Sequence, residues 1–489
     1  MGGGNKHPVD EAYAQGQSLG TPGNGVVIIN DLHSGLNPSE VVEIVSADSL
    51  EAIRAGIARA RALGIPVSVA GGRYAMGGQQ FCAGGVVLDT KKLNRVLGID
   101  TERGFVEVEA GIQWPALIEY LETIQAGLTS QWTIAQKQTG ADRLSIGGTI
   151  SANAHGRGLT MKPFVSDIKS LVLVNANGET VECSRDRNYE LFCLVAGGYG
   201  LFGCIYSATL RLAPRRMLER VVELGKIDDL VTRFNERISD GFLYGDFQFA
   251  IDDTSEDFLR AGVFSCYRPV EREQQPTADQ RELSRDDWIG LITLAHTDKR
   301  QAFKFYSEHY LATSGQVYYS DRHQLADYLD GYHQQLDEAL GAVHRATEMI
   351  SELCVPRDRL ADFMIAAAED FREHNVDVIY GTIRLIERDD ESFLAWASEP
   401  WACVIFNLHT VHTPDGIVRA AEAFRRLIDL AIERGGTYYL TYHRWAEREQ
   451  VETCYPQLRQ FLGLKREYDP EERFQSDWYR HYRDLLLDT

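Results

Sequence analysis

The chain has 489 residues, of which 50 are Lys or Arg and 71 are Asp or Glu, so its formal net charge is -21 at pH 7. A surface this acidic repels a phosphate backbone and suits anionic membranes poorly, which argues against general nucleic-acid binding. The composition, 44% hydrophobic and 25% charged, is that of a globular protein, and the length suggests two or three domains.

Neither a membrane span nor an export signal is expected. No apolar run approaches the roughly 20 residues that cross a bilayer, and the first residues, MGGGNKHPVDEAYAQ, lack a hydrophobic signal core. The eight cysteines are scattered without a CxxC pair, which favours reduced, buried thiols over disulfides or a zinc site. The sequence therefore predicts a cytoplasmic protein without a metal site, and it leaves the oligomeric state open.

The first half of the chain alternates between predicted strands and helices. Strands are expected at residues 41–45, 67–70, 86–89 and 105–110. One helix is expected to start at Asp48 and end at Gly64, and another to begin at Pro115. Asn177-Gly178 predicts a hairpin between strands at 171–174 and 180–182.

The pattern changes after Pro214, where longer helical segments appear. Strands are expected at residues 244–251, 378–386 and 404–411. The polar stretch 271–287 has few apolar anchors and is expected to be a loop. A second domain is therefore expected to begin near residue 215.

Three glycine-rich segments are candidates for ligand binding. Residues 69–79 read VAGGRYAMGGQ, residues 138–158 read QTGADRLSIGGTISANAHGRG, and residues 195–205 read VAGGYGLFGCI. Consecutive glycines let backbone N–H groups approach a diphosphate, although a flexible turn is the alternative. The first segment is neither a Walker A loop nor GxGxxG. Small residues in the second favour a large flat group packed on the backbone, with tight strand packing as the alternative.

In their order and spacing, AGGRYAMGGQ, EAGIQWPALIEYL, SIGGTISANAHGRG and AGGYGLFGCIYSATLRL resemble the vanillyl-alcohol oxidase/p-cresol methylhydroxylase (PCMH-type) family of flavoproteins. The resemblance covers residues 38–214. It implies an α+β fold with a PCMH-type FAD-binding domain of two α+β subdomains, formed by residues 1–214. It further implies a substrate (cap) domain at 215–430, with an antiparallel sheet flanked by helices, and a C-terminal return to the FAD domain at 431–489.

Carried over position by position, the resemblance implies a set of FAD-binding residues: Gly71, Gly72, Arg73, Tyr74, Ala75, Met76, Gly77, Gly140, Ser145, Gly147, Gly148, Ala152, Asn153, His155, Ile205 and Tyr439. Many family members carry in the first loop a His that bonds covalently to the flavin, and Tyr74 stands at that position. Residues 139–158 also lack the Cys that other members use. The expected cofactor is therefore tightly but non-covalently bound FAD.

Two segments of the second half resemble substrate-domain strands of sugar-alcohol oxidases and of decaprenylphosphoryl-ribose oxidase. In MISELCVP, residues 349–356, the resemblance places Glu352 against the flavin ring. In YGTIRL, residues 380–385, it places Arg384 near a substrate oxygen, on the same strand face as Tyr380 by period-two alternation. A solvated Glu and a surface Arg are the alternatives.

Further polar candidates follow toward the C-terminus. Asn407 and His409 share one face of a strand, which is either exposed or lines a pocket. The segment GGTYYLTYHRW, residues 435–445, resembles the family's return strand. Tyr442 aligns there with the catalytic Lys of the ribose oxidase, which is absent, and Arg444 follows as a possible cation. The tail YDPEERFQSDW, residues 468–478, resembles a family motif that fixes the C-terminus.

The resemblance implies an FAD-dependent oxidase or dehydrogenase that oxidises a C–OH group of a sugar, polyol or other alcohol by hydride transfer to flavin N5, with O2 or another acceptor reoxidising the flavin. The protein must deprotonate and polarise the substrate. The predicted catalytic residues are Tyr442, Glu352, Arg384, His409, Asn407 and Arg444, with His443 ranked below Tyr442 as a base because alternation turns it the other way. Oxidation of a C–N bond or oxidative tailoring of a natural product is one alternative, and a non-catalytic flavin-binding partner protein is another.

Overall fold

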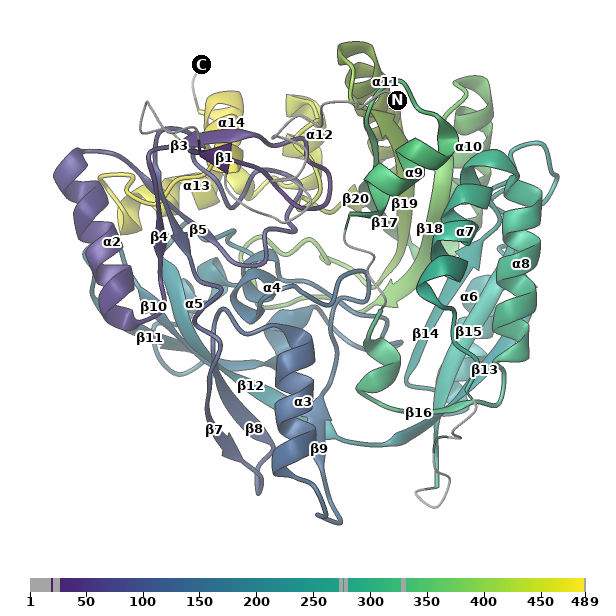
Figure 1. The fold of residues 1–489 in the computed structure, drawn as a ribbon, viewed down its shortest axis with the longest axis horizontal. Coiled ribbons are helices and arrows are strands. Elements are labelled where there is room, and N and C mark those ends of the chain that lie inside the picture. The colour runs from purple at the N-terminus through teal and green to yellow at the C-terminus, as the bar shows by residue number, and fades with distance from the viewer. Residues whose placement is uncertain (1–18, 21–26, 272–275, 277–279, 327–330, 488–489) are drawn as a thin grey trace, which may run out of the picture.

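A computed structural model describes residues 19–20, 27–271, 276, 280–326 and 331–487 (Figure 1). The fold is α+β, as expected, with most strand pairs antiparallel. Residues 1–18, the basis for expecting no export signal, lie outside the described part, as do 272–275 and 277–279 of the expected loop. Among the described helices, none is long and apolar enough to cross a membrane.

A small parallel sheet opens the first half. Its order is β4 (Glu43–Ser46), β6 (Val86–Asp89), β5 (Val67–Ala70), and α2 (Leu50–Leu63) buries Ile53, Ile57 and Ala60. The helix begins one residue later than expected, since Ser49 is its N-cap; Gly64 ends it at φ 65. An antiparallel sheet of β1 (Leu19–Gly20), β2 (Val27–Ile29) and β3 (Ser39–Val41) precedes it, so the strand expected at 41–45 is split between β3 and β4.

A second sheet has the order β11-β10-β12-β8-β7, with β9 paired to β12. Its strands are β7 (Val96–Asp100), β8 (Phe105–Glu109), β9 (Trp132–Ile134), β10 (Ile168–Val174), β11 (Thr180–Ser184) and β12 (Cys204–Pro214). Helices α3 (Trp114–Ile124), α4 (Ile146–Ala152) and α5 (Tyr189–Val195) and a 3-10 turn at Phe164–Asp167 connect them. The expected hairpin is confirmed, because β10 pairs with β11 across Gly178, whose φ is 80.

The third sheet is eight-stranded, with the order β16-β13-β15-β14-β18-β19-β17-β20. Its strands are β13 (Met217–Lys226), β14 (Tyr244–Phe249), β15 (Ala261–Val270), β16 (Val317–Tyr319), β17 (Ala346–Pro356), β18 (Val378–Ile386), β19 (Trp401–Val411) and β20 (Thr437–Tyr438). Its flanking elements are α6 (Leu230–Ser239), α7 (Arg285–Thr297), α8 (Lys299–Ala312), α9 (Tyr332–Leu340), α10 (Leu360–Glu373) and α11 (Pro414–Ile432), with 3-10 turns at Arg322–Gln324 and Arg357–Arg359. The expected loop ends early, because Ser284 and Asp287 form a capping box that starts α7.

The two faces of this third sheet differ. On one face Phe406 of β19 packs on Phe363 and Phe371 of α10, in the apolar core. Side chains alternate along a strand, so Asn407 and His409 lie on the opposite face. Register places Glu348 of β17 opposite His409, which puts polar residues from neighbouring strands on that same face.

The last segment of the chain connects the two halves of the molecule (Figure 1). Strand β20 pairs with β17 of the large sheet. Helices α12 (Arg448–Cys454), α13 (Leu458–Tyr468) and α14 (Asp477–Leu486) follow. Phe474 forms a parallel bridge with Val67 of β5, and the Val67 N–H donates to the Arg473 carbonyl at 2.7 Å. The chain end is thereby attached to the edge of the first sheet.

Candidate functional site

A cavity of about 1260 Å³, including its open mouth, lies where the glycine segments meet β17 and the C-terminal return. Its wall includes the loop after β5, the turns of α4, Ile350 of β17 and the residues just after β20. The lining is mostly apolar and glycine-rich, with a few polar side chains such as Thr441 and Gln138. A mostly apolar cavity of this size is suited to a large ligand with a flat ring system.

The absence of a side chain at Gly71 and at Gly72 is a steric requirement. A Cβ on Gly72 would lie 2.4 Å from the Arg143 carbonyl oxygen, and one on Gly71 would lie 2.1 Å from Ser145 Oγ. The loop after β5 therefore packs directly against the segment that starts α4. Ser145 holds that start by accepting a bond from the Gly148 N–H at 3.2 Å.

Most residues for which FAD binding was predicted line this cavity: Gly71, Gly72, Arg73, Tyr74, Ala75, Met76, Gly140, Ser145, Gly147, Gly148, Ala152, Ile205 and Tyr439. The other three do not. The Gly77 N–H donates to Gln79. Asn153 is fully buried and donates to Asp389 at 2.8 Å. His155 turns toward Glu352.

The cavity wall carries one cation at the glycine loop. Arg73 adopts the left-handed conformation, with φ 62, directly after the glycine pair. Burial lowers the pKa of its guanidinium against an opposing effect of Asp89, yet an arginine stays charged at any physiological pH. Backbone N–H groups and this cation are suited to a diphosphate. Tyr74 lies beside it, and no Cys lines the described cavity wall.

A chain of buried polar groups leads away from the cavity wall. Tyr442 lines the cavity, and its hydroxyl donates to Glu352 Oε2 at 3.4 Å. The other carboxylate oxygen lies 2.7 Å from His155 Nε2. Because His155 Nδ1 lies 3.0 Å from the Gly156 carbonyl, which only accepts, Nδ1 carries a proton. The short contact on the other side then requires one more proton between His155 and Glu352.

The phenol of Tyr442 is held in its neutral form. Burial raises its pKa well above the usual value, the neighbouring Glu352 raises it further, and the charge of Arg384 lowers it in part. The neutral Tyr442 hydroxyl therefore donates a hydrogen bond to Glu352. It can take up a second proton only if it passes its own proton to Glu352 at the same time. The sequence-based ranking of Tyr442 above His443 agrees with the geometry, because His443 stacks on Phe424 away from the cavity.

Arg384 is buried on β18, close enough to Tyr442 for its charge to lower the pKa of the phenol. It is 5% exposed, and its Nε and Nη1 have no hydrogen-bond partner in the described part of the chain. Leaving a buried charged donor unsatisfied is costly, so these two groups need a partner from outside the described chain, such as water or a bound ligand. The alternative interpretation of Arg384 as a surface residue is therefore wrong.

The other predicted catalytic residues lie apart from the cavity wall. The Arg444 guanidinium donates to the Asp477 carbonyl at 2.9 Å and so fixes α14. Asn407 donates to the Tyr380 carbonyl at 3.5 Å. His409 approaches Glu348, at 3.4 Å from Oε1. Of the six predicted catalytic residues, only Tyr442 is among the residues that line the cavity; Glu352 and Arg384 are buried behind the wall.

The cluster around Glu348 was not predicted from the sequence. Besides His409, His296 Nε2 lies 3.3 Å from Oε1 and His333 Nδ1 lies 2.9 Å from Oε2. Burial alone would raise the pKa of Glu348, but the three neighbouring histidines hold it well below its usual range. The alternation of Glu348, Ile350 and Glu352 could have placed Glu348 on the same strand face as Glu352, but the predicted strand segment began at Met349. His296 and His333 come from helices distant in the sequence, and no local pattern connects them with Glu348.

Comparison with known proteins gives one family match and several relatives. Residues 43–184 match the family described as "FAD binding domain". An uncharacterized oxidoreductase of the fasciation locus of Rhodococcoides fascians is 35% identical over 189 residues, 36% of this chain and 37% of that protein. L-gulonolactone oxidase of Bos taurus is 30% identical over 171 residues, 35% of this chain and 37% of the relative.

A longer match extends through the large sheet. Decaprenylphosphoryl-beta-D-ribose oxidase of Mycolicibacterium smegmatis is 23% identical over 419 residues, 82% of this chain and 86% of the relative. The chain spans little more than a third of the length of the first two relatives. The matched FAD-binding segment contains the first glycine loop and α4, which form much of the cavity wall. Residues 43–184 thus form an FAD-binding domain of the PCMH type, and the relatives support the resemblance of the chain to the flavoprotein family of vanillyl-alcohol oxidase and p-cresol methylhydroxylase.

Proposed function

We propose that this protein is an FAD-dependent oxidoreductase that oxidises a C–OH group of a sugar-, polyol- or other alcohol-type substrate. The observation that carries the proposal is the buried Tyr442–Glu352–His155 chain, which reaches the cavity at Tyr442. Behind the cavity wall, Arg384 is near enough for its charge to act on Tyr442. A proton acceptor and a cation near one another are what removal of a hydroxyl proton requires. Two relatives are named as oxidases of sugar-type compounds, which supports the substrate class.

The residues present fit FAD. Glycines 71 and 72 leave the backbone accessible, and Arg73 would hold the diphosphate. Ser145, Ala152 and the other small residues of α4 would line the flavin channel. FAD would supply the two-electron acceptor for oxidation of the substrate. Tyr74, in place of the usual linking His, supports non-covalent binding.

The chain's own residues would manage one proton. Tyr442 would accept the proton of the substrate hydroxyl while passing its own to Glu352. The proton already shared by Glu352 and His155 would then reside on His155 Nε2, where the carboxylate stabilises the imidazolium. Because the three groups are buried, solvent water is kept from this relay. Arg384 would donate hydrogen bonds to a substrate oxygen and stabilise its developing negative charge.

The proposed function also implies a division of the chain into two domains. Residues 1–214 and 431–489 would form the FAD-binding domain, and residues 215–430 the substrate domain, which contributes Ile350 of β17 to the cavity wall. The bridge between Val67 and Phe474 supports a single FAD-binding unit made from both chain ends.

The proposal is tested by adding alcohols, sugars, lactones and amines without oxygen to the purified flavoprotein and following the flavin band. Bleaching by a compound whose only oxidisable group is C–OH supports it. Bleaching by amines alone indicates C–N oxidation, and no bleaching by any compound indicates a binding protein. Recovery of the band on adding O2 then separates an oxidase from a dehydrogenase with another acceptor.

A further inference from the structure

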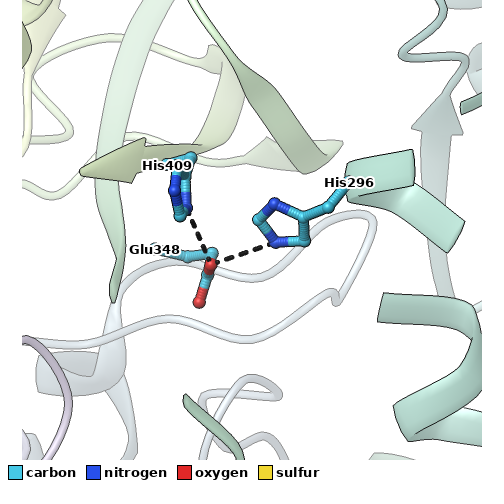
Figure 2. Close-up of side chains that lie close together, drawn as sticks. All are labelled: His296, Glu348 and His409. Atoms are coloured by element: carbon cyan, nitrogen blue, oxygen red, sulfur yellow. Dashed lines mark hydrogen bonds and ion pairs between the residues drawn. The ribbon is translucent and has the colours of Figure 1, made fainter. Parts of the chain in front are cut away.

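A second polar cluster lies on the same face of the large sheet as the proposed relay. Figure 2 shows His409 reaching from β19 and His296 from α7 toward the carboxylate of Glu348 on β17. The nearest nitrogens, Nε2 of His296 and Nδ1 of His409, lie 3.3 and 3.4 Å from one carboxylate oxygen, Oε1. One donor atom from each residue lies within 4.8 Å of the other two.

These separations are long for charged hydrogen bonds. A histidinium that donates to a carboxylate does so at about 2.7–2.9 Å, and two donors on one oxygen would be drawn to that range. Nitrogen and oxygen ligands about 2.0–2.1 Å from a tetrahedral zinc ion are, by geometry, about 3.3 Å from one another. The two observed distances match that spacing, and two histidines with one carboxylate are a recurrent ligand set for divalent transition metals.

The surroundings of the cluster hold the carboxylate in a fixed orientation. Its other oxygen, Oε2, accepts a hydrogen bond from the Tyr332 hydroxyl at 2.6 Å and lies 2.9 Å from His333 Nδ1. Ligating carboxylates are typically bonded in this way by groups outside the metal's own ligands. The Glu348 and His296 side chains are each 5% exposed, and His409, at 20%, gives access from the open side.

We propose that His296, Glu348 and His409 bind a divalent transition-metal ion of the zinc type, with three protein ligands and at least one open coordination position. The ion would join α7 to the neighbouring strands β17 and β19 of the large sheet. This inference is independent of the proposed oxidation chemistry. Glu348 and Glu352 are four residues apart on β17, so the ion would lie about 13 Å from the relay along the strand.

The experiment uses the FAD-loaded full chain, purified without a polyhistidine tag, stripped with EDTA and given zinc alone. The expected result is one zinc ion per chain by elemental analysis, with a higher midpoint of thermal unfolding in zinc than in EDTA, because an ion that binds only the folded state stabilises it. Cobalt(II) at the same stoichiometry should give tetrahedral ligand-field absorption between the flavin band and the red end of the spectrum.

Two variants and one control decide the assignment. His409→Ala and Glu348→Gln should each lose the zinc and the shift in melting midpoint, whereas His374→Ala, an exposed histidine on the end of α10, should keep both. Retention of FAD shows that a variant is folded; if His409→Ala does not fold, Glu348→Gln, which keeps the side-chain shape, provides the test. Substoichiometric zinc in the wild-type chain, or equal zinc in Glu348→Gln, would overturn the proposal. Zinc binding should persist in Tyr442→Phe, so failure of the proposed oxidation and failure of the metal site are distinguishable.

Discussion

The Tyr442 hydroxyl lies 3.4 Å from Glu352 Oε2, although the two residues are 90 positions apart in the chain. The contact exists because β20, just before Tyr442, pairs with β17, which carries Glu352. The C-terminal return thus positions a phenol at the cavity wall and a carboxylate behind it. In the proposed reaction, a substrate proton taken up at the wall would have a buried acceptor because these two strands are neighbours.

Replacing Arg384 by Met should weaken substrate binding and the oxidation step together. Its two unpartnered donors are buried and would otherwise bond a substrate oxygen. Hydrogen bonds to a charged group contribute ~1.5–3 kcal/mol, so we expect kcat/KM to fall by about 10- to 100-fold. Steady-state kinetics measures this, with Arg59→Met, a surface arginine paired with Glu43, as the control. An unchanged kcat/KM would remove Arg384 from the substrate site.

Acid precipitation should release all of the flavin. Tyr74 occupies the position of the usual linking His, and no Cys lines the described cavity wall. We expect the yellow colour in the supernatant and a protein mass equal to that of the bare chain. A protein mass increased by that of FAD would contradict this, and peptide mapping would then identify the linking residue.

Gly72→Ala should impair FAD binding. The new methyl group would lie 2.4 Å from the Arg143 carbonyl oxygen, a distance that requires the backbone of one loop to shift. We expect the flavin occupancy after purification to fall and the dissociation constant to rise at least about tenfold, which corresponds to ~1.4 kcal/mol. Gly98→Ala on β7, where a methyl group meets nothing within 4 Å, is the matched control. Equal FAD affinity in the two variants would mean that the loop packing is not needed for binding.

The stability of the protein should fall in acid partly because of His443. Burial lowers the pKa of His443 from 6.5 to about 3. Between these values the unfolded chain binds a proton that the folded chain does not, so lowering the pH through this window favours unfolding, by ~1.4 kcal/mol per pH unit. In His443→Phe, which can retain the stack on Phe424 and Trp445, the free energy of unfolding should decline less steeply below pH 6.5. Urea unfolding at several pH values measures the difference, and parallel curves for wild type and variant would exclude the effect.

Much of the local structure was accessible from the sequence because it depends on neighbouring residues. The strand at Val378–Ile386, the helix end at Gly64 and the hairpin at Gly178 each follow from alternation or from a glycine that adopts positive φ. The pair Gly71-Gly72 was likewise recognisable as a candidate for close approach to another group, but only the structure decides between that and a flexible turn.

Side-chain partners that lie far apart in the chain could not be predicted from the sequence. Arg444 reads as a cation near the flavin, but its partner Asp477 belongs to the terminal helix, which no local pattern places. His155 lies in a segment predicted to line the cavity, yet it faces Glu352 on another sheet. The cluster at Glu348 joins α7, α9, β17 and β19, whose positions relative to one another are set by tertiary packing.

The most direct test of the central claim is the rate of flavin reduction in a single turnover without oxygen, compared between wild type, Tyr442→Phe and Glu352→Gln. With an alcohol substrate that bleaches the wild type, both variants should be slower by about 10²-fold or more, since general base catalysis contributes 10²–10⁴-fold. Tyr189→Phe, an exposed tyrosine of α5, should be unchanged. Reduction of the Tyr442→Phe flavin at the wild-type rate would contradict the role of the Tyr442–Glu352 pair in taking the substrate proton.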